Sequence, residues 1–224
     1  MKKRSFWRDN GLALAMLVCF LLFVMGQTLT GWHDNNNEAL LHHDATLSLG
    51  EYLLSGAFYE GLFENWESEF LQMGAYIVLT VFLFQKGSSE SKDPDKSNAV
   101  DEPIDKHRDD KGAPRPVKAG GWKLAIYKHS LSIAFFAAFF LSFTGHLIGG
   151  AKAYSDELKD YGHAPVSALE YLTTARFWFE SLQNWQSEFL AMFCIVVASI
   201  YLREHGSPES KPVWAPHSET GEEG

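Results

Sequence analysis

Cysteine and proline are scarce in this sequence, which contains 2 cysteines and 8 prolines in 224 residues. Both cysteines, Cys19 and Cys194, fall within apolar stretches. A disulfide framework is therefore not expected, and each cysteine is most simply a small core residue.

The motifs of several enzyme classes are also missing. The sequence has no phosphate-binding glycine loop, no nucleophile elbow, no His-Glu-x-x-His and no Cys-x-x-Cys, and each of these chemistries depends on its own arrangement. The basic residues border the apolar stretches, as topology determinants do, and do not indicate contacts with nucleic acid. We predict no catalytic residues and no nucleic-acid partner.

The histidines give little support for a cofactor. A bis-histidine haem site requires facing histidines on different membrane spans, and only His146 lies well inside an apolar stretch. The first outer segment combines histidines and carboxylates that would suit a metal, but the second copy of the sequence has Lys152, Tyr161 and Gly162 at the histidine positions. We therefore expect no metal and no cofactor. The residues of this rejected metal site are His33, Asp34, Glu38, His42, His43 and Asp44.

Apolar residues are concentrated in four blocks, although the net charge of −9 alone would suit an acidic soluble protein. Crossing the hydrocarbon core of a bilayer requires about 20 helical residues. Two blocks nearly reach this length alone, and two need the turn that precedes them. We predict spans at about 11–30, 66–85, 130–150 and 185–203. The alternative is a soluble bundle of four buried helices, which the lack of any polar face over 12–25 disfavours.

The chain is a tandem duplication with a shift of 119 positions. Between 48–92 and 167–211, 19 of 45 positions are identical, whereas unrelated segments share roughly one in fifteen. Each repeat contains two spans, so both enter the membrane from the same side as parallel copies, which disfavours an inverted-repeat transporter. Repeat 1 is assigned to 1–94 and repeat 2 to 120–213, while composition predicts a disordered linker at 87–121 and a disordered tail at 214–224.

The distribution of charge predicts the orientation of the spans. Of the 19 Lys and Arg residues, 16 lie in the two tails or the linker, which the positive-inside tendency places in the cytoplasm. The start of the chain also resembles a secretory signal peptide, but its counterpart at 131–150 is internal and must be a permanent span. We predict a multi-pass protein of the cell (inner) membrane with both termini cytoplasmic.

Each outer segment carries a capping box, formed by Ser48 with Glu51 and by Ser167 with Glu170. The aromatic, amphipathic sequence that follows predicts a short helix in the outer interface. The fold class expected is thus an all-α membrane protein of four transmembrane helices, arranged as two parallel hairpins with short outer interfacial helices.

An Asn-Trp-x-Ser-Glu-Phe-Leu motif follows each outer helix. Its asparagines are predicted to cap the returning membrane helices, and its glutamates would lie in the first turn, where the helix dipole favours them. Retention of the Trp, Ser, Phe and Leu positions indicates a packed contact on every face of the turn. The motif includes Asn65, Trp66 and Ser68 in the first copy and Asn184, Trp185 and Ser187 in the second.

A few polar residues lie at membrane depth. Gln27 and His146 coincide in the repeat register, so we predict Gln27 near Glu69 and His146 near Glu188, or the crossed pairs. Ionisable groups at this depth are costly unless paired. The pairs would act as interhelical hydrogen bonds or as a proton-sensitive site. A Gly-x-x-x-Gly run at 145–149 further predicts close backbone contact there.

With these motifs, the chain resembles a family of uncharacterised bacterial multi-pass membrane proteins. The resemblance rests on Asn-Trp-x-Ser-Glu-Phe-Leu at 65–71 and 184–190 and on Gly-Ser-x-Glu-Ser-Lys at 87–92 and 206–211. It covers the chain from about 5 to 213 and implies no activity, substrate or site residues.

Three hypotheses about function follow. The first is a non-enzymatic integral membrane protein, structural or stress-related, whose partner is the lipid bilayer and which is compatible with a homo-oligomer. The second is a small oligomeric ion, proton or solute conduit that uses Glu69, Glu188 and His146. The third, a membrane enzyme that holds a lipid on the aromatic outer segments, has the least support.

Overall fold

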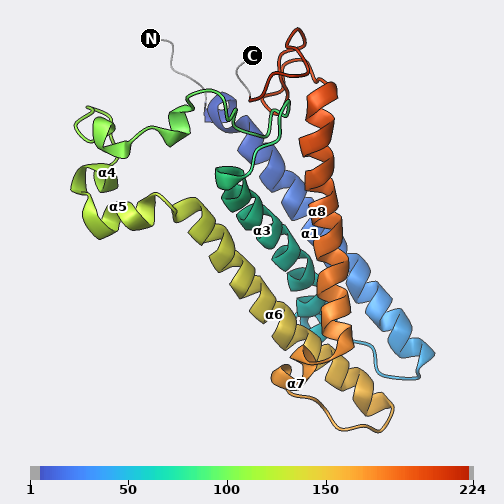
Figure 1. The fold of residues 1–224 in the computed structure, drawn as a ribbon. Helices are drawn as coiled ribbons and strands as arrows, with labels where there is room; N and C mark the ends of the chain where they lie inside the picture. Colours follow the sequence, from blue (N-terminus) through green and yellow to red (C-terminus); the bar gives the residue numbers. More distant parts are fainter. Residues whose placement is uncertain (1–5, 222–224) are drawn as a thin grey trace. The chain divides into compact units, whose positions relative to one another are not determined.

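The computed structural model describes residues 6–221, and this part of the chain is helical (Figure 1). Helices account for 69% of the structure, without strands in the described part. The predicted all-α class is thus confirmed. The long helices are α1 (Phe6–Leu41), α3 (Gly56–Phe82), α6 (Ser130–Asp160) and α8 (Ala175–Tyr201).

Two of these helices, α1 and α6, are long and apolar enough to cross a membrane. They contain 36 and 31 residues, and at about 1.5 Å per residue each exceeds the roughly 30 Å of a hydrocarbon core. Helix α3 carries four carboxylates in its first half and α8 carries two, so their apolar stretches are shorter. The spans expected at 66–85 and 185–203 therefore stay predictions.

Short helices precede α3 and α8. Helix α2 (Leu49–Tyr52) and helix α7 (Ala168–Leu172) each begin with a capping box. The Ser48 N–H donates to Glu51 at 2.8 Å, and the Ser167 N–H donates to Glu170 at 2.7 Å. These backbone hydrogen bonds, with further ones from the serine hydroxyls, lower the pKa of both glutamate carboxyls.

Helices α3 and α8 begin well before the Asn-Trp motif, which corrects the expected capping role of Asn65 and Asn184. Their caps are instead Ser55 and Thr174, whose hydroxyls each accept the backbone N–H three residues on at 3.2 Å. Neither segment between cap and motif contains proline, so nothing interrupts the helix there. Most of each expected interfacial helix therefore forms the first turns of α3 or α8.

A buried tyrosine packs against a glycine in both copies of the sequence. Tyr52 lies against Gly31, and Tyr171 lies against Gly150, where an added Cβ would overlap the tyrosine ring. The tyrosines are 6% and 0% exposed. Only glycine leaves room for this contact in either copy.

The ends of the outer loops are held in the same way by different side chains. The amide of Asn36 accepts the Leu47 N–H at 2.8 Å and donates to its carbonyl at 2.9 Å. In the second copy the Ser155 hydroxyl accepts the Val166 N–H at 3.0 Å and donates to its carbonyl at 3.1 Å. Leu47 and Val166 occupy equivalent positions in the two repeats. In each copy one side chain therefore hydrogen-bonds both the N–H and the carbonyl of this loop residue.

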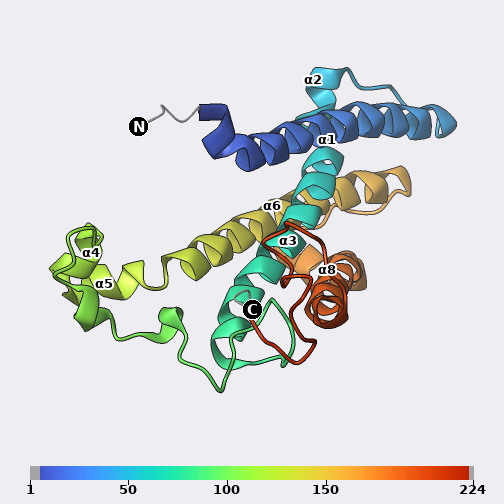
Figure 2. The ribbon, with the colours of Figure 1, turned by 90° about the horizontal axis from the view of Figure 1, so that it is seen from above.

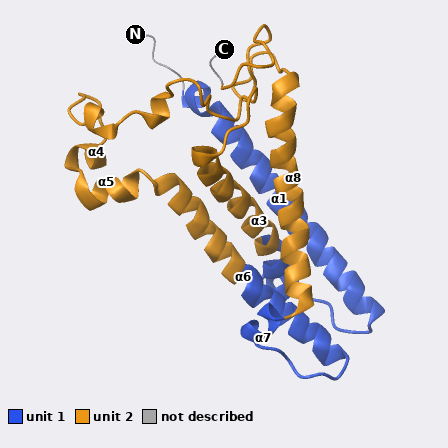
Figure 3. Ribbon diagram, in the orientation of Figure 1, with its two compact units in different colours: residues 1–62, 145–173 blue, residues 63–144, 174–224 orange. Residues whose placement is uncertain are grey.

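The chain divides into two compact units, coloured separately in Figure 3. Unit 1 comprises 1–62 and 145–173, and unit 2 comprises 63–144 and 174–224. Within unit 1 the backbones of α3 and α6 approach closely at Gly149, where an added Cβ would lie 2.7 Å from the Glu60 nitrogen. Gly149 is the second glycine of the predicted Gly-x-x-x-Gly run.

The segment between the repeats contains only short helices, and its predicted disorder stays a prediction. It contains two short 3-10 helices, η1 (Ala99–Asp101) and η2 (Ile104–His107), followed by α4 (Arg115–Ala119) and α5 (Gly121–Tyr127). The C-terminal residues lie beside the loop that follows α3 (Figure 2). The described part of the tail is therefore not detached from the rest of unit 2.

Candidate functional site

The two Gly-Ser-x-Glu-Ser-Lys motifs form similar turns at the ends of α3 and α8. We call residues 87–92 the first motif turn and residues 206–211 the second motif turn. Their glycines have φ angles of 87° and 88°, a conformation that favours glycine. The fifth residue, Ser91 or Ser210, accepts the N–H six residues earlier at 2.9 or 3.0 Å. The second residue, Ser88 or Ser207, accepts the glutamate N–H at 3.1 or 3.2 Å.

The two motif turns contact each other within unit 2. The Ser89 hydroxyl donates to the Glu209 carbonyl at 3.2 Å, and the Lys211 ammonium donates to the Gly87 carbonyl at 2.5 Å. Ser88 also shares a buried hydrogen bond of 2.8 Å with Ser199 of α8. Motifs 119 residues apart thus join the ends of the two helices.

Lys211 is the most enclosed charged residue of this region, with 1% of its surface exposed. Besides Gly87, its ammonium donates to the carbonyls of Glu219, His217 and Pro216 at 2.8, 3.1 and 3.3 Å. Burial lowers the pKa of Lys211, nearby Arg203 lowers it further, and Glu219 acts in the opposite direction. The carbonyl dipoles stabilise the charge that burial disfavours.

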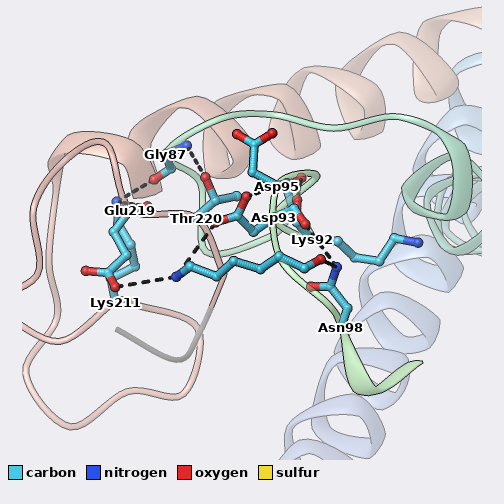
Figure 4. Close-up of polar contacts among 10 residues, drawn as sticks. Gly87, Lys92, Asp93, Asp95, Asn98, Lys211, Glu219 and Thr220 are labelled. Carbon is cyan, nitrogen blue, oxygen red and sulfur yellow. Dashed lines mark hydrogen bonds and ion pairs between the residues drawn. The ribbon is translucent and has the colours of Figure 1, made fainter. Parts of the chain in front are cut away.

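Residues 212–221, which we call the C-terminal strap, lie against the first motif turn. The Thr220 hydroxyl accepts the Gly87 N–H at 2.9 Å, and the Gly221 N–H donates to the Ser88 carbonyl at 3.0 Å. Figure 4 shows Thr220 and Lys211 on either side of Gly87. The strap therefore binds the N–H of Gly87 through Thr220, while Lys211 of the second motif turn binds its carbonyl.

A cleft of about 750 Å³ lies beside the strap in unit 2. Its wall on α3 includes Tyr76, whose hydroxyl donates to the Glu90 carboxylate at 3.2 Å. Lys92 also lines the cleft and pairs with Asp101 at 2.8 Å. The cleft thus presents hydroxyls, carboxylates and ammonium groups together. Its lining includes Tyr76, Thr80, Val81, residues 89–93, residues 96–101, Thr220 and Gly221.

The Asn-Trp motif forms a second polar cluster in unit 2. The Trp185 indole donates to the Glu67 carboxylate at 3.2 Å, and the Asn184 amide donates to Glu64 at 2.5 Å. Glu67 is fully buried. The second-copy motif therefore contacts carboxylates of α3 through Asn184 and Trp185. Its Ser187, Phe189 and Leu190 are exposed, so the turn is not packed on every face as expected.

The motif serines have the same local role in both copies. Ser68 donates to the Asn65 carbonyl at 2.7 Å, and Ser187 donates to the Asn184 carbonyl at 2.8 Å. The ring of Trp66 lies edge-on to Phe63, 5.5 Å between centroids. The hydrogen bonds of Ser68 and Ser187 to the helix backbone explain why both copies have serine at this position.

The predicted intramembrane pairs fall into different units. Gln27 lies in unit 1, where its amide donates to the Gly61 carbonyl at 2.9 Å, and buried His146 also belongs to unit 1. Glu69 and Glu188 lie in unit 2, close enough to interact electrostatically. The structure therefore places the two glutamates within range of an electrostatic interaction, which we had not predicted. The Gln27–Glu69 and His146–Glu188 pairs stay predictions.

The sequence indicated the repeated motif turns but not their contact or the strap. The available signal was that the same hexapeptide follows both returning helices. The contact between the turns could not be predicted from the sequence, because it joins residues more than 100 positions apart. Among residues 6–221 no group of three His, Cys, Asp or Glu side chains is placed to hold a metal ion.

Comparison with known proteins identifies the family of the chain. No curated protein and no solved structure matches the chain. The model of a domain of unknown function, DUF6766, matches residues 3–222, which is nearly the whole sequence and confirms the expected relationship to a family without an assigned activity. The chain therefore belongs to the DUF6766 family.

Proposed function

We propose that this protein is a structural or stress-related, non-enzymatic component of the cell (inner) membrane, built from two parallel helical hairpins. The observation that carries the proposal is that residues retained in both copies form the same local bonds in both copies. The capping boxes, the tyrosine–glycine contacts and the motif turns all show this. Both copies therefore retain these residues because each residue is needed to form the same local structure twice.

The membrane topology that we propose has four spans, with both termini in the cytoplasm. Its support is the apolar length of α1 and α6, the 119-residue offset between the bounds of α3 and α8, and the positions of the basic residues. In this topology the motif turns and the strap lie on the cytoplasmic side, and α2 and α7 lie outside.

A complementation experiment tests the structural role. Cells lacking the protein are exposed to osmotic or detergent stress, and leakage of a periplasmic reporter is measured. We expect the native chain and a Glu69→Gln, Glu188→Gln double variant to restore the barrier equally. Gly149→Leu, which disturbs helix packing, is expected to fail at equal abundance in the membrane. Failure of the carboxylate variant alone would contradict the structural role.

The second candidate is a proton or cation conduit, and the electrostatic interaction between Glu69 and Glu188 favours it. Two carboxylates from equivalent repeat positions interact electrostatically in unit 2, and such an arrangement can bind a proton or a cation. Flux into proteoliposomes separates the candidates. A conduit predicts flux above protein-free vesicles that the double variant abolishes, whereas the structural role predicts none for either chain.

A further inference from the structure

The two motif lysines occupy the same position in the repeat but have different partners. Lys92 forms an ion pair with Asp101, whose two carboxylate oxygens lie 2.8 and 2.9 Å from the ammonium. In the second copy the position of Asp101 is occupied by Thr220. Lys211 thus has no carboxylate at the corresponding place, and its ammonium is bound by backbone carbonyls instead.

This difference couples Lys211 to the strap. A buried ammonium is costly unless hydrogen bonds replace its lost hydration. Three of the carbonyls that do so belong to residues 216, 217 and 219 of the strap, and they surround the ammonium only while the strap is folded back. The lysine therefore positions the strap, and the carbonyls of the strap replace the water that would otherwise hydrogen-bond the lysine ammonium.

We propose that the C-terminal strap is a latch, which Lys211 holds against the first motif turn and which opens as a unit when this ammonium is removed. The strap contains no α-helix or strand within its described residues. The strap is also bound to the end of α8, because Arg203 donates to the Ala215 carbonyl at 3.1 Å and a ring nitrogen of His217 lies 3.1 Å from the Ile200 carbonyl. A segment without regular structure nevertheless opens at a lower free energy than the helices that it covers. Opening of the strap should therefore precede unfolding of α3 and α8.

The latch controls one wall of the cleft. Thr220 and Gly221 belong both to the strap and to the cleft lining. The Thr220 hydroxyl accepts the Gly87 N–H of the first motif turn, and the Gly221 N–H donates to the Ser88 carbonyl. Release of the strap would remove this wall and would uncover Gly87 and Ser88, which are buried in the closed form. The closed and open forms would thus present different surfaces at the end of α3.

Hydrogen exchange measured by mass spectrometry tests the latch on the full chain in detergent micelles. In Lys211→Met we expect exchange of the strap amides to rise by about tenfold or more, since hydrogen bonds to a charged donor are lost. Lys92→Met is the matched control. It removes the ammonium at the same motif position, where the partner is Asp101 and not the strap, and it should leave strap exchange unchanged.

Two further arms keep the test decisive if Lys211→Met folds poorly. Thr220→Val removes only the acceptor for the Gly87 N–H and should raise strap exchange partially. In Lys211→Ala, added methylammonium should restore protection, whereas tetramethylammonium, which has no N–H donor, should not. Unchanged exchange in Lys211→Met would overturn the proposal. An equal rise in the α3 and α8 peptides would also overturn it, since the strap would then not open separately.

Discussion

Replacement of Gly149 by alanine should destabilise the protein, because two helix backbones meet at this residue. An alanine Cβ would lie 2.7 Å from the Glu60 nitrogen and 2.7 Å from the Tyr59 Cβ. Comfortable contacts between such atoms are about 3.5–4.0 Å, so the helices would have to separate by roughly 1 Å. Overpacking of this kind typically costs about 1–3 kcal/mol.

Gly26→Ala is the matched control, since nothing lies within 4 Å of the added atom. Alanine favours a helix over glycine by about 1 kcal/mol at either site. We therefore expect Gly149→Ala to be less stable than Gly26→Ala by about 1–3 kcal/mol, measured by SDS-induced unfolding in mixed micelles. Equal stability of the two variants, or a more stable Gly149→Ala, would refute the close approach of α3 and α6.

Two other predictions concern polar contacts. Trp185→Phe removes the indole donor to buried Glu67 and should cost about 1–3 kcal/mol in the same unfolding assay, while the exposed Trp122→Phe should have little effect. His107 should titrate above its usual pKa of 6.5, because hydrogen bonds to Asp110 and to a second carboxylate favour its charged form. Its ion pairs would stabilise the local turn at low pH and weaken as the pH rises through the raised pKa. An NMR titration that gives the same pKa for His107 in the native chain and in Asp110→Asn would contradict this contact.

Local rules predicted much of the fold. The long apolar runs indicated α1 and α6, since a helix that is apolar on all sides is either buried in a protein core or surrounded by lipid. The Ser-x-x-Glu spacing indicated where α2 and α7 begin, because a capping box is made within four residues. These features depend on neighbours in sequence, which a single sequence displays directly.

The errors arose where two local signals competed or where contacts were distant. Asn65 has the chemistry of a cap, but Ser55 caps the helix earlier, and a helix that has begun continues at low cost. The ion pair of Lys92 with Asp101 in the linker was likewise not predicted, and the disorder expected there from polarity stays a prediction. The environment of Lys211 could not be predicted, because its ligands come from Gly87 and from the strap.

Cysteine accessibility in intact cells tests the parallel two-hairpin topology most directly. Cys19 and Cys194 are first changed to alanine, the residue at the corresponding position of the other copy. Single cysteines are then placed at Ala45 and Ala164, equivalent loop positions, and at Ser97 in the linker. The topology predicts that a membrane-impermeant maleimide labels the first two in intact cells and the third only after lysis. Labelling of only one of the first two, or of Ser97→Cys in intact cells, would contradict it.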